Sequence, residues 1–347
     1  MKMKVFWLYT RQCPYPIRFF NLLGESVDLT VAFHHVQKKE HTHFYGDHIK
    51  TFHTVSLKPY YLGGSHQILS LLGQKTFDRV ILDGNRSLLE RRAASFVTNQ
   101  GSSFSYFFSY QDKVDQKYLA SASHCFVPDL SWKQKLSLEG VSNQTIHLYH
   151  DAILLSSETI SRPLNEKERL LLRQGLGLHE KKIYISINTL SMVKQNLALL
   201  DLWKSMPQET LLLLFVDGTN KHFYQERIQK RHLTNVKLLL GEKRDDVLKY
   251  LRIADAALWT DEEDSYPYQV TTALSQGVPV FGNKKSPVTK KLIQEGINGY
   301  PLDFHHDFAS LFVKPLPPAM AQAAIESAKS FTLENMLQEC KNVLLLP

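Results

Sequence analysis

Cysteine is scarce in this 347-residue sequence, and its pattern argues against the common thiol-based sites. The three cysteines, Cys13, Cys125 and Cys340, lie far apart and have no metal or redox spacing. The chain has 15 histidines, seven of them between His34 and His66. A zinc site nevertheless needs ligands that converge in a fixed geometry, and no H-E-x-x-H pattern is present. We therefore predict no metal site and a reducing, cytoplasmic environment.

Long apolar runs are absent as well. The longest, Leu211–Val216, is far shorter than the roughly 20 residues that a membrane-spanning helix needs. The first residues, MKMKVFWLYTRQ, contain only a few apolar side chains before Arg11, which favours a β-strand over a signal peptide. We expect a cytoplasmic protein, and any contact with the inner face of the cell membrane would be peripheral.

The glycine-rich motifs of common nucleotide-binding enzymes are missing too. Residues 10–16 read T-R-Q-C-P-Y-P, with neither a G-x-G-x-x-G fingerprint nor a P-loop lysine. Pro14 and Pro16 preclude a glycine-type phosphate cradle at this position. The sequence therefore gives little support to a nicotinamide dehydrogenase or an ATPase, and we predict no cofactor.

The net charge is +7, but the basic residues are not concentrated. They form pairs, such as Lys284-Lys285 and Lys290-Lys291, and no run of five or more, so most are expected on a solvated surface. The charge suits three anionic partners: a sugar nucleotide, a nucleic acid or the inner membrane surface. Nucleic acid is the least favoured, because no aromatic-basic motif such as RNP1 is present.

Strand-like and helix-like segments alternate along the whole chain, which is the pattern of parallel α/β sheets. The predicted strands are Val5–Tyr9, Leu29–His34, Arg79–Leu82, Phe104–Phe108, His124–Val127, Thr145–Tyr149, Lys182–Ile187, Thr210–Val216, Val236–Leu239, Ala256–Trp259 and Pro279–Gly282. The predicted helices are Ile17–Leu23, Gln67–Leu72, Ser87–Thr98, Glu166–Gln174, Asn196–Lys204, His222–Arg231, Asp245–Arg252, Tyr268–Gln276, Ala319–Ala328 and Leu333–Leu345. A polar linker, Ser156–Glu166, interrupts the alternation, so we predict two doubly wound domains.

The most informative segment runs from Ile253 to Leu302. It contains a predicted buried strand, an acidic and aromatic loop over Asp261–Tyr268, and a helix that stops at Gly277. Ligand sites of α/β proteins form at the carboxyl ends of parallel strands. The amides that open this helix, from Tyr268 to about Thr271, would suit a phosphate group.

Residues 260–280 read T-D-E-E-D-S-Y-P-Y-Q-V-T-T-A-L-S-Q-G-V-P-V. They resemble the motif P-S-x-x-E-G-F-G-L-P-x-x-E-A-x-A-x-G-x-P-V of GT-B glycosyltransferases of the retaining family four type. E-G-I-N-G at 295–299 is similar to the family's D-G-x-N-G turn, and S-I-N-T-L-S-M-V-K at 186–194 to its V-G-R-L-x-x-x-K pattern. The resemblance is strong from Lys182 to Leu302 and weak before Ser121.

The resemblance implies a GT-B architecture, in which two Rossmann-like domains with parallel sheets face each other across a cleft. Residues 1–160 would be the acceptor-side domain, and residues 161–329 the domain that binds the nucleotide sugar. Residues 330–347 would form a C-terminal helix that packs back toward the first domain. The acceptor-side residues would include Tyr60, Tyr61, Tyr110 and Asp112.

The resemblance also implies catalytic and donor-binding residues. Lys194 occupies the family's lysine position and would stabilise the leaving diphosphate. Asp264 aligns with the glutamate that binds donor-sugar hydroxyls, and the adjacent Glu263 could take its place. The other implied donor-binding residues are Asn188, Thr189, Gly241, Glu242, Lys243, Ser265, Tyr266, Pro267, Tyr268, Gln269, Val270, Thr271 and Thr272.

Three positions depart from the family pattern. Thr272 replaces the glutamate that usually binds the ribose, and a threonine hydroxyl cannot match a bidentate carboxylate. Thr189 replaces a phosphate-binding arginine, and Tyr110 stands where a histidine often follows the fifth strand. These losses are compatible with either an unusual mode of donor binding or an inactive relative.

We therefore predict a metal-independent, retaining hexosyltransferase. It would move a sugar from a nucleotide-sugar donor, with UDP-sugars favoured, to a hydroxyl of a bacterial surface glycan, either free or lipid-linked. The alternative is a catalytically inactive homologue that acts as a partner subunit or a glycan-binding module. The net charge and Phe19-Phe20 suit loose contact with an anionic membrane, although the two phenylalanines could equally belong to the core. The sequence leaves the oligomeric state open.

Overall fold

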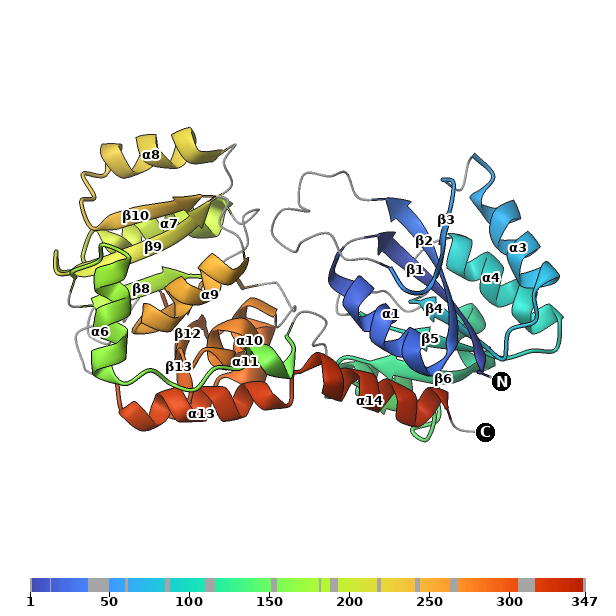
Figure 1. Ribbon diagram of the computed structural model, residues 1–347. Coiled ribbons are helices and arrows are strands. Elements are labelled where there is room, and N and C mark those ends of the chain that lie inside the picture. The colour runs from blue at the N-terminus through green and yellow to red at the C-terminus, as the bar shows by residue number, and fades with distance from the viewer. Residues whose placement is uncertain are drawn as a thin grey trace. The chain divides into compact units, whose positions relative to one another are not determined.

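The chain folds into two compact units in the computed structural model shown in Figure 1. One unit joins Met1–Leu154 with Leu333–Pro347, and the other comprises Leu155–Thr332. The unit boundaries thus fall a few residues from the predicted positions 160 and 329. The structure describes residues 2–12, 14–36, 50–59, 62–84, 88–109, 116–150, 155–180, 182–187, 193–216, 220–240, 244–262, 268–304 and 316–345.

The first unit contains a seven-stranded parallel sheet in the order β3-β2-β1-β4-β5-β6-β7. Its strands are β1 (Lys4–Gln12), β2 (Asp28–Val36), β3 (His53–Ser56), β4 (Arg79–Asp83), β5 (Phe104–Phe107), β6 (Ala122–Val127) and β7 (Ile146–Leu148). Central strands of such sheets are apolar throughout because helices cover both faces. In β1, Phe6 and Leu8 belong to the core cluster that includes Ala93, whereas Trp7 contacts the rings of Phe19 and Phe20.

Helices cover both faces of this sheet (Figure 1). They are α1 (Pro14–Ser26), α3 (Gly64–Gln74), α4 (Leu88–Asn99), α5 (Leu130–Leu138) and α14 (Leu333–Leu344), with the short 3₁₀ helix η3 (Gln116–Ser121). The C-terminal helix α14 packs against α1. Glu339 of α14 accepts hydrogen bonds from the backbone N–H of His150 at 2.8 Å and from its imidazole Nδ1 at 2.7 Å. The last helix is therefore tied to the end of β7.

The second unit contains a six-stranded parallel sheet in the order β10-β9-β8-β11-β12-β13. Its strands are β8 (Lys182–Ser186), β9 (Thr210–Val216), β10 (Val236–Leu240), β11 (Ala256–Trp259), β12 (Val280–Asn283) and β13 (Gly299–Leu302). Its helices are η4 (Ser157–Thr159), α6 (Glu166–Gly175), α7 (Val193–Trp203), α8 (Lys221–Lys230), α9 (Arg244–Ile253), α10 (Tyr268–Ser275), α11 (Pro287–Leu292) and α13 (Pro318–Lys329). Both sheets confirm the predicted doubly wound α/β class.

Strands β3 and β13 and helix α5 were not predicted from the sequence. Strand β3 reads H-T-V-S and is largely exposed, so it lacks the apolar run of a buried strand. Helix α5 has only two buried side chains, Trp132 and Leu136, and its apolar periodicity is correspondingly weak. Strand β13 contains Pro301, which argues against a strand unless it lies at the edge of a sheet, as it does here.

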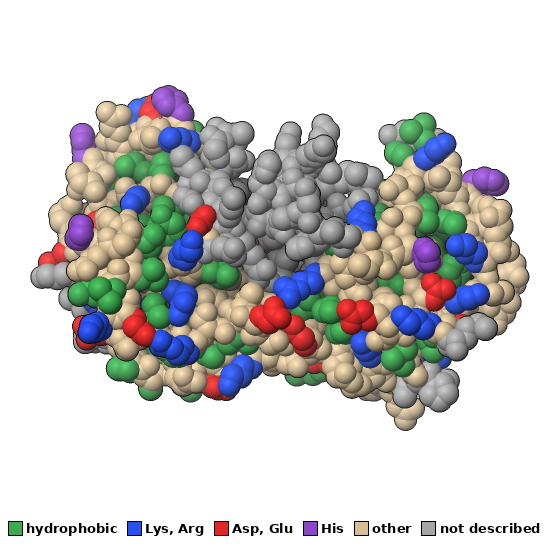
Figure 2. Space-filling model, in the orientation of Figure 1, with side chains coloured by type: hydrophobic (Ala, Val, Ile, Leu, Met, Phe, Trp, Pro, Cys, Tyr) green, Lys and Arg blue, Asp and Glu red, His purple; other side chains and the backbone are tan. Residues whose placement is uncertain are grey.

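Charged side chains are mixed on the surface. On the face shown in Figure 2, lysine and arginine side chains are interspersed with aspartate and glutamate. This view therefore shows no single broad basic patch. None of the helices within the described ranges has the length and apolar character that a bilayer crossing requires.

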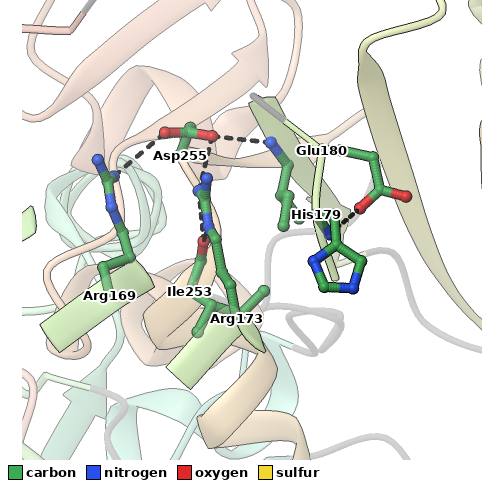
Figure 3. Close-up of polar contacts among 7 residues, drawn as sticks. Arg169, Arg173, His179, Glu180, Ile253 and Asp255 are labelled. Atoms are coloured by element: carbon green, nitrogen blue, oxygen red, sulfur yellow. Dashed lines mark hydrogen bonds and ion pairs between the residues drawn. The ribbon is translucent and has the colours of Figure 1, made fainter. Parts of the chain in front are cut away.

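A buried ionic network joins the amino ends of β8 and β11 (Figure 3). Oδ2 of Asp255 accepts hydrogen bonds from the backbone N–H of Ile183 at 2.7 Å and from the guanidinium of Arg173 at 2.9 Å. Arg173 also donates to the carbonyl of Ile253, and Arg169 donates to Oδ1 of Asp255 at 3.1 Å. The Asp255 and Arg173 side chains are each 8% exposed, so both charges depend on these partners.

The Asp255→Ala substitution should lower the free energy of unfolding by about 3 kcal/mol, because it leaves the buried Arg173 without its counter-charge. Arg169→Ala removes a partner that is 35% exposed and should cost less than about 1 kcal/mol. Urea denaturation followed by tryptophan fluorescence measures both. Equal losses in the two variants would contradict the role given to burial.

Two partly buried histidines are hydrogen-bonded between β6 and β7. Nδ1 of His124 and Nε2 of His147 lie 3.0 Å apart, so the N–H of one ring donates a hydrogen bond to the unprotonated nitrogen of the other. Burial is the main cause that lowers the pKa of both imidazoles. The positive charge of Arg79 lowers the pKa of His124 further, and His124 and Lys133 do the same for His147. The folded unit therefore favours the neutral pair.

This pair should make the protein less stable in mild acid. With the folded pKa values below the ordinary 6.5, the unfolded chain binds more protons as the pH falls through that value, so stability is lost below it. His147→Gln should reduce the loss measured by urea denaturation between about pH 7.5 and 5.5. The exposed His66→Gln is the control, and an identical loss in all three proteins would disprove the effect.

Candidate functional site

The carboxyl ends of β8, β11 and β12 form the candidate site of the second unit. Strand β8 pairs with β9 on one side and with β11 on the other. From β8 the strands are added first toward one edge of the parallel sheet, as β9 and β10, and then toward the other, as β11 to β13. Such a switch point is where open α/β sheets bind ligands. Helix α7 follows β8, and helix α10 follows β11.

The first turn of α7 is anchored to the sheet through Asn196. This residue is 1% exposed, its Oδ1 accepts a hydrogen bond from Ser186 at 3.4 Å, and its Nδ2 donates to the Tyr224 hydroxyl at 3.4 Å. Lys194 lies in the same turn and is exposed. Within the part of the chain that the structure describes, Lys194 has no ion-pair partner.

The loop after β11 begins with two carboxylates that already hold protein partners. Asp261 is 4% exposed, and its Oδ1 accepts a hydrogen bond from Nε2 of Gln195 at 3.4 Å. Oε1 of Glu262 lies 3.3 Å from both Nζ of Lys285 and Nδ2 of Asn283. For Glu262, the ion pair with Lys285 offsets part of the repulsion expected between this acidic loop and a phosphate.

Helix α10 begins at Tyr268, as predicted, and its residues from Val270 to Ser275 are buried. The Thr271 hydroxyl donates to the carbonyl of Tyr268 at 3.1 Å. In contrast, Oγ1 of Thr272 and Oε1 of Gln269 are buried and have no hydrogen-bond partner among the residues that the structure describes. Residues three apart lie on the same side of a helix, so the two unsatisfied oxygens belong to one side of α10.

Only part of the predicted site can be compared with the structure. Lys194, Tyr268, Gln269, Val270, Thr271 and Thr272 are described, and the Val270 side chain is fully buried in the core, which leaves only its backbone for a ligand. The following predicted residues lie outside the described ranges: Tyr60, Tyr61, Tyr110, Asp112, Asn188, Thr189, Gly241, Glu242, Lys243, Glu263, Asp264, Ser265, Tyr266 and Pro267.

Sequence reasoning missed the residues that hold this edge together. Asn196 interrupts a helical face that is otherwise apolar, with Leu199, Leu200 and Trp203 buried at the expected spacing. That interruption was a usable signal for a buried polar anchor. No comparable signal links Gln195 to Asp261, because the contact joins residues 66 positions apart. Among the described side chains, no group of three or more histidines, cysteines or carboxylates could hold a metal ion.

Residues 168–312 match the protein family described as glycosyl transferases group 1. This range contains β8 to β13 and hence the whole candidate edge. No curated protein sequence is significantly similar to the chain.

Solved structures share the fold over nearly the full length. HepE from Anabaena, in complex with UDP and glucose, has a TM-score of 0.72 and 16% identity, with 99% of this chain and 100% of that chain covered. A glycosyltransferase from Rickettsia africae has a TM-score of 0.74 and 12% identity, with 99% of each chain covered. The lipopolysaccharide outer core galactosyltransferase WaaB has a TM-score of 0.69 and 14% identity, again with 99% of each chain covered. The fold is GT-B, as the sequence resemblance implied.

Replacing the unsatisfied Thr272 hydroxyl should stabilise the free protein. Thr272→Val removes a buried oxygen that no described residue hydrogen-bonds, and it should raise the free energy of unfolding by about 1 kcal/mol. Thr271→Val is the matched control, because it removes a satisfied hydrogen bond on the same helix and should lower stability by about 1 kcal/mol. Urea denaturation distinguishes the two, and shifts of the same sign would contradict the assignment.

Proposed function

We propose, from the premise that residues 168–312 belong to the glycosyl transferases group 1 family, that this chain transfers a sugar from a nucleotide-sugar donor to an acceptor hydroxyl. One observation carries the proposal: the family match, residues 168–312, includes the sheet edge at which β8 and β11 end and the helices α7 and α10 that follow them. HepE, which shares the fold, was crystallised with UDP, with UDP and glucose, and with UDP-glucose. We therefore favour a UDP-sugar as the donor.

The donor diphosphate would bind at the amino end of α10, where backbone amides and the helix dipole favour an anion. The exposed charge of Lys194 would stabilise the diphosphate as it leaves. Because Asp261 and Glu262 already hold Gln195 and Lys285, the sugar hydroxyls are assigned to Glu263 and Asp264. Tyr268, Gln269, Thr271 and Thr272 stay proposed donor contacts.

Transfer would proceed with retention and without a metal or a cofactor. The bond from the anomeric carbon to the phosphate oxygen breaks, and a bond from that carbon to the acceptor oxygen forms on the same face. The acceptor proton passes to the leaving phosphate, so no protein nucleophile is required. This stereochemistry rests on the resemblance to retaining enzymes.

The acceptor is proposed to be a bacterial surface glycan, free or lipid-linked, in polysaccharide biosynthesis. The residues of this chain that we propose to contact the acceptor include Tyr60, Tyr61, Tyr110 and Asp112. The net charge of +7 supports a peripheral contact with the anionic inner face of the cell membrane. Because WaaB is a lipopolysaccharide galactosyltransferase of the same fold, a lipid-linked acceptor is a reasonable first substrate to test.

A second candidate is an inactive homologue that serves as a partner subunit or a glycan-binding module. One observation favours it: the family's ribose-binding glutamate is Thr272 here, and its hydroxyl oxygen is buried. Incubation with UDP-, GDP- and dTDP-sugars separates the two functions. A chain that shows neither a thermal shift nor slow hydrolysis with any donor would be the inactive homologue.

Lys194→Ala should lower the rate of UDP release from the preferred UDP-sugar by about 100-fold or more, because it removes the cation that stabilises the leaving diphosphate. Its melting temperature should stay close to that of the wild type, since the side chain is exposed. Lys237→Ala is the matched control, because Lys237 is also an exposed lysine but lies on β10. Unchanged release in Lys194→Ala would remove this residue from the site.

A further inference from the structure

We propose that Asp261 is a positioning residue that holds, through Gln195, the turn of α7 that carries Lys194. The inference rests on the proposed function, because it concerns the cation of the same site. Asp261 itself would touch neither donor nor acceptor. Its effect would pass through one hydrogen bond to the neighbour of the catalytic lysine.

The contact joins the two halves of the proposed diphosphate site. Asp261 lies in the loop that leads from β11 to α10, and Gln195 directly follows Lys194 in α7. Nε2 of Gln195 donates to Oδ1 of Asp261 at 3.4 Å. The loop that leads to the α10 amides and the turn that carries the cation are therefore linked across the sheet edge.

Both sides of this link make further contacts with the protein. On the α7 side, the next residue, Asn196, is anchored by Ser186 and Tyr224. On the loop side, Glu262 follows Asp261 and is held by Lys285 and Asn283. The hydrogen bond therefore joins two segments that other contacts also hold, so a shift of the Asp261 loop is passed on to the first turn of α7.

A lysine depends strongly on contacts that position its backbone, such as the hydrogen bond between Gln195 and Asp261. Lys194 is exposed, and its long side chain has about 2 kcal/mol of rotamer entropy, so the protein can direct it mainly through the backbone that carries it. Displacing a catalytic group by about 1 Å can cost about 100-fold in rate.

The test compares Gln195→Ala, Asp261→Ala and Asp261→Asn with Lys194→Ala, using UDP release from the preferred UDP-sugar and UDP affinity by calorimetry. Gln195→Ala should slow release by about 10-fold, because the lysine is then misplaced and not lost. Asp261→Asn should keep most of the rate, since its amide oxygen still accepts from Gln195. Gln208→Ala, at an exposed glutamine that accepts a hydrogen bond from Thr234, is the matched control.

The double variant Lys194→Ala/Gln195→Ala decides whether Gln195 acts through the lysine. If it does, the double variant is no slower than Lys194→Ala alone. Additive losses, or a Gln195→Ala rate within about twofold of the wild type, would overturn the inference while leaving the proposed function intact. A Lys194→Ala rate equal to the wild type would instead remove the lysine from the proposed site. Should Asp261→Ala fail to fold, Gln195→Ala and Asp261→Asn still decide the matter.

Discussion

The pairing of β8 with β11 is the constraint on which the second unit depends. At the amino ends of these strands, Asp255 binds the backbone N–H of Ile183 and the guanidinium of Arg173, all away from water. Because the two strands are parallel and paired in register, their carboxyl ends lie at the same edge of the sheet. Ser186, the last residue of β8, and Trp259, the last residue of β11, consequently lie at one edge.

The opposite edge has a different chemistry, although the same strands form it. The amino-end network is closed, since its buried charges satisfy one another. The carboxyl edge holds the buried polar residues Asn196, in the first turn of α7, and Asp261, in the loop after β11. It also holds the exposed Lys194 and two oxygens on α10 that have no hydrogen-bond partner in the described part of the chain. A closed network favours stability, whereas an edge with available groups favours binding, which is the division expected of an α/β sheet.

Strands and helices were predicted most accurately where the local pattern of apolar and polar residues was strongest. The predicted limits of β9 and β11 coincide with the observed ones, because a continuous apolar run bounded by polar residues has few other structures open to it. The start of α10 at Tyr268 was predicted as well. Strand β3 escaped prediction because its H-T-V-S segment is stabilised by pairing with β2 and not by burial of its own side chains. Glu263, Asp264 and the acceptor-side residues stay predictions.

The amino-acid sequence by itself determined the alternation of strands and helices, the two-unit organisation and the position of the acidic loop before α10. These features depend on local periodicity and on polar breaks in the chain, which are readable one segment at a time. Only the tertiary structure decided that Gln195 meets Asp261 and that Glu262 is held by Lys285. Those contacts depend on the order of strands in the sheet, and strand order follows from the burial of all the segments together.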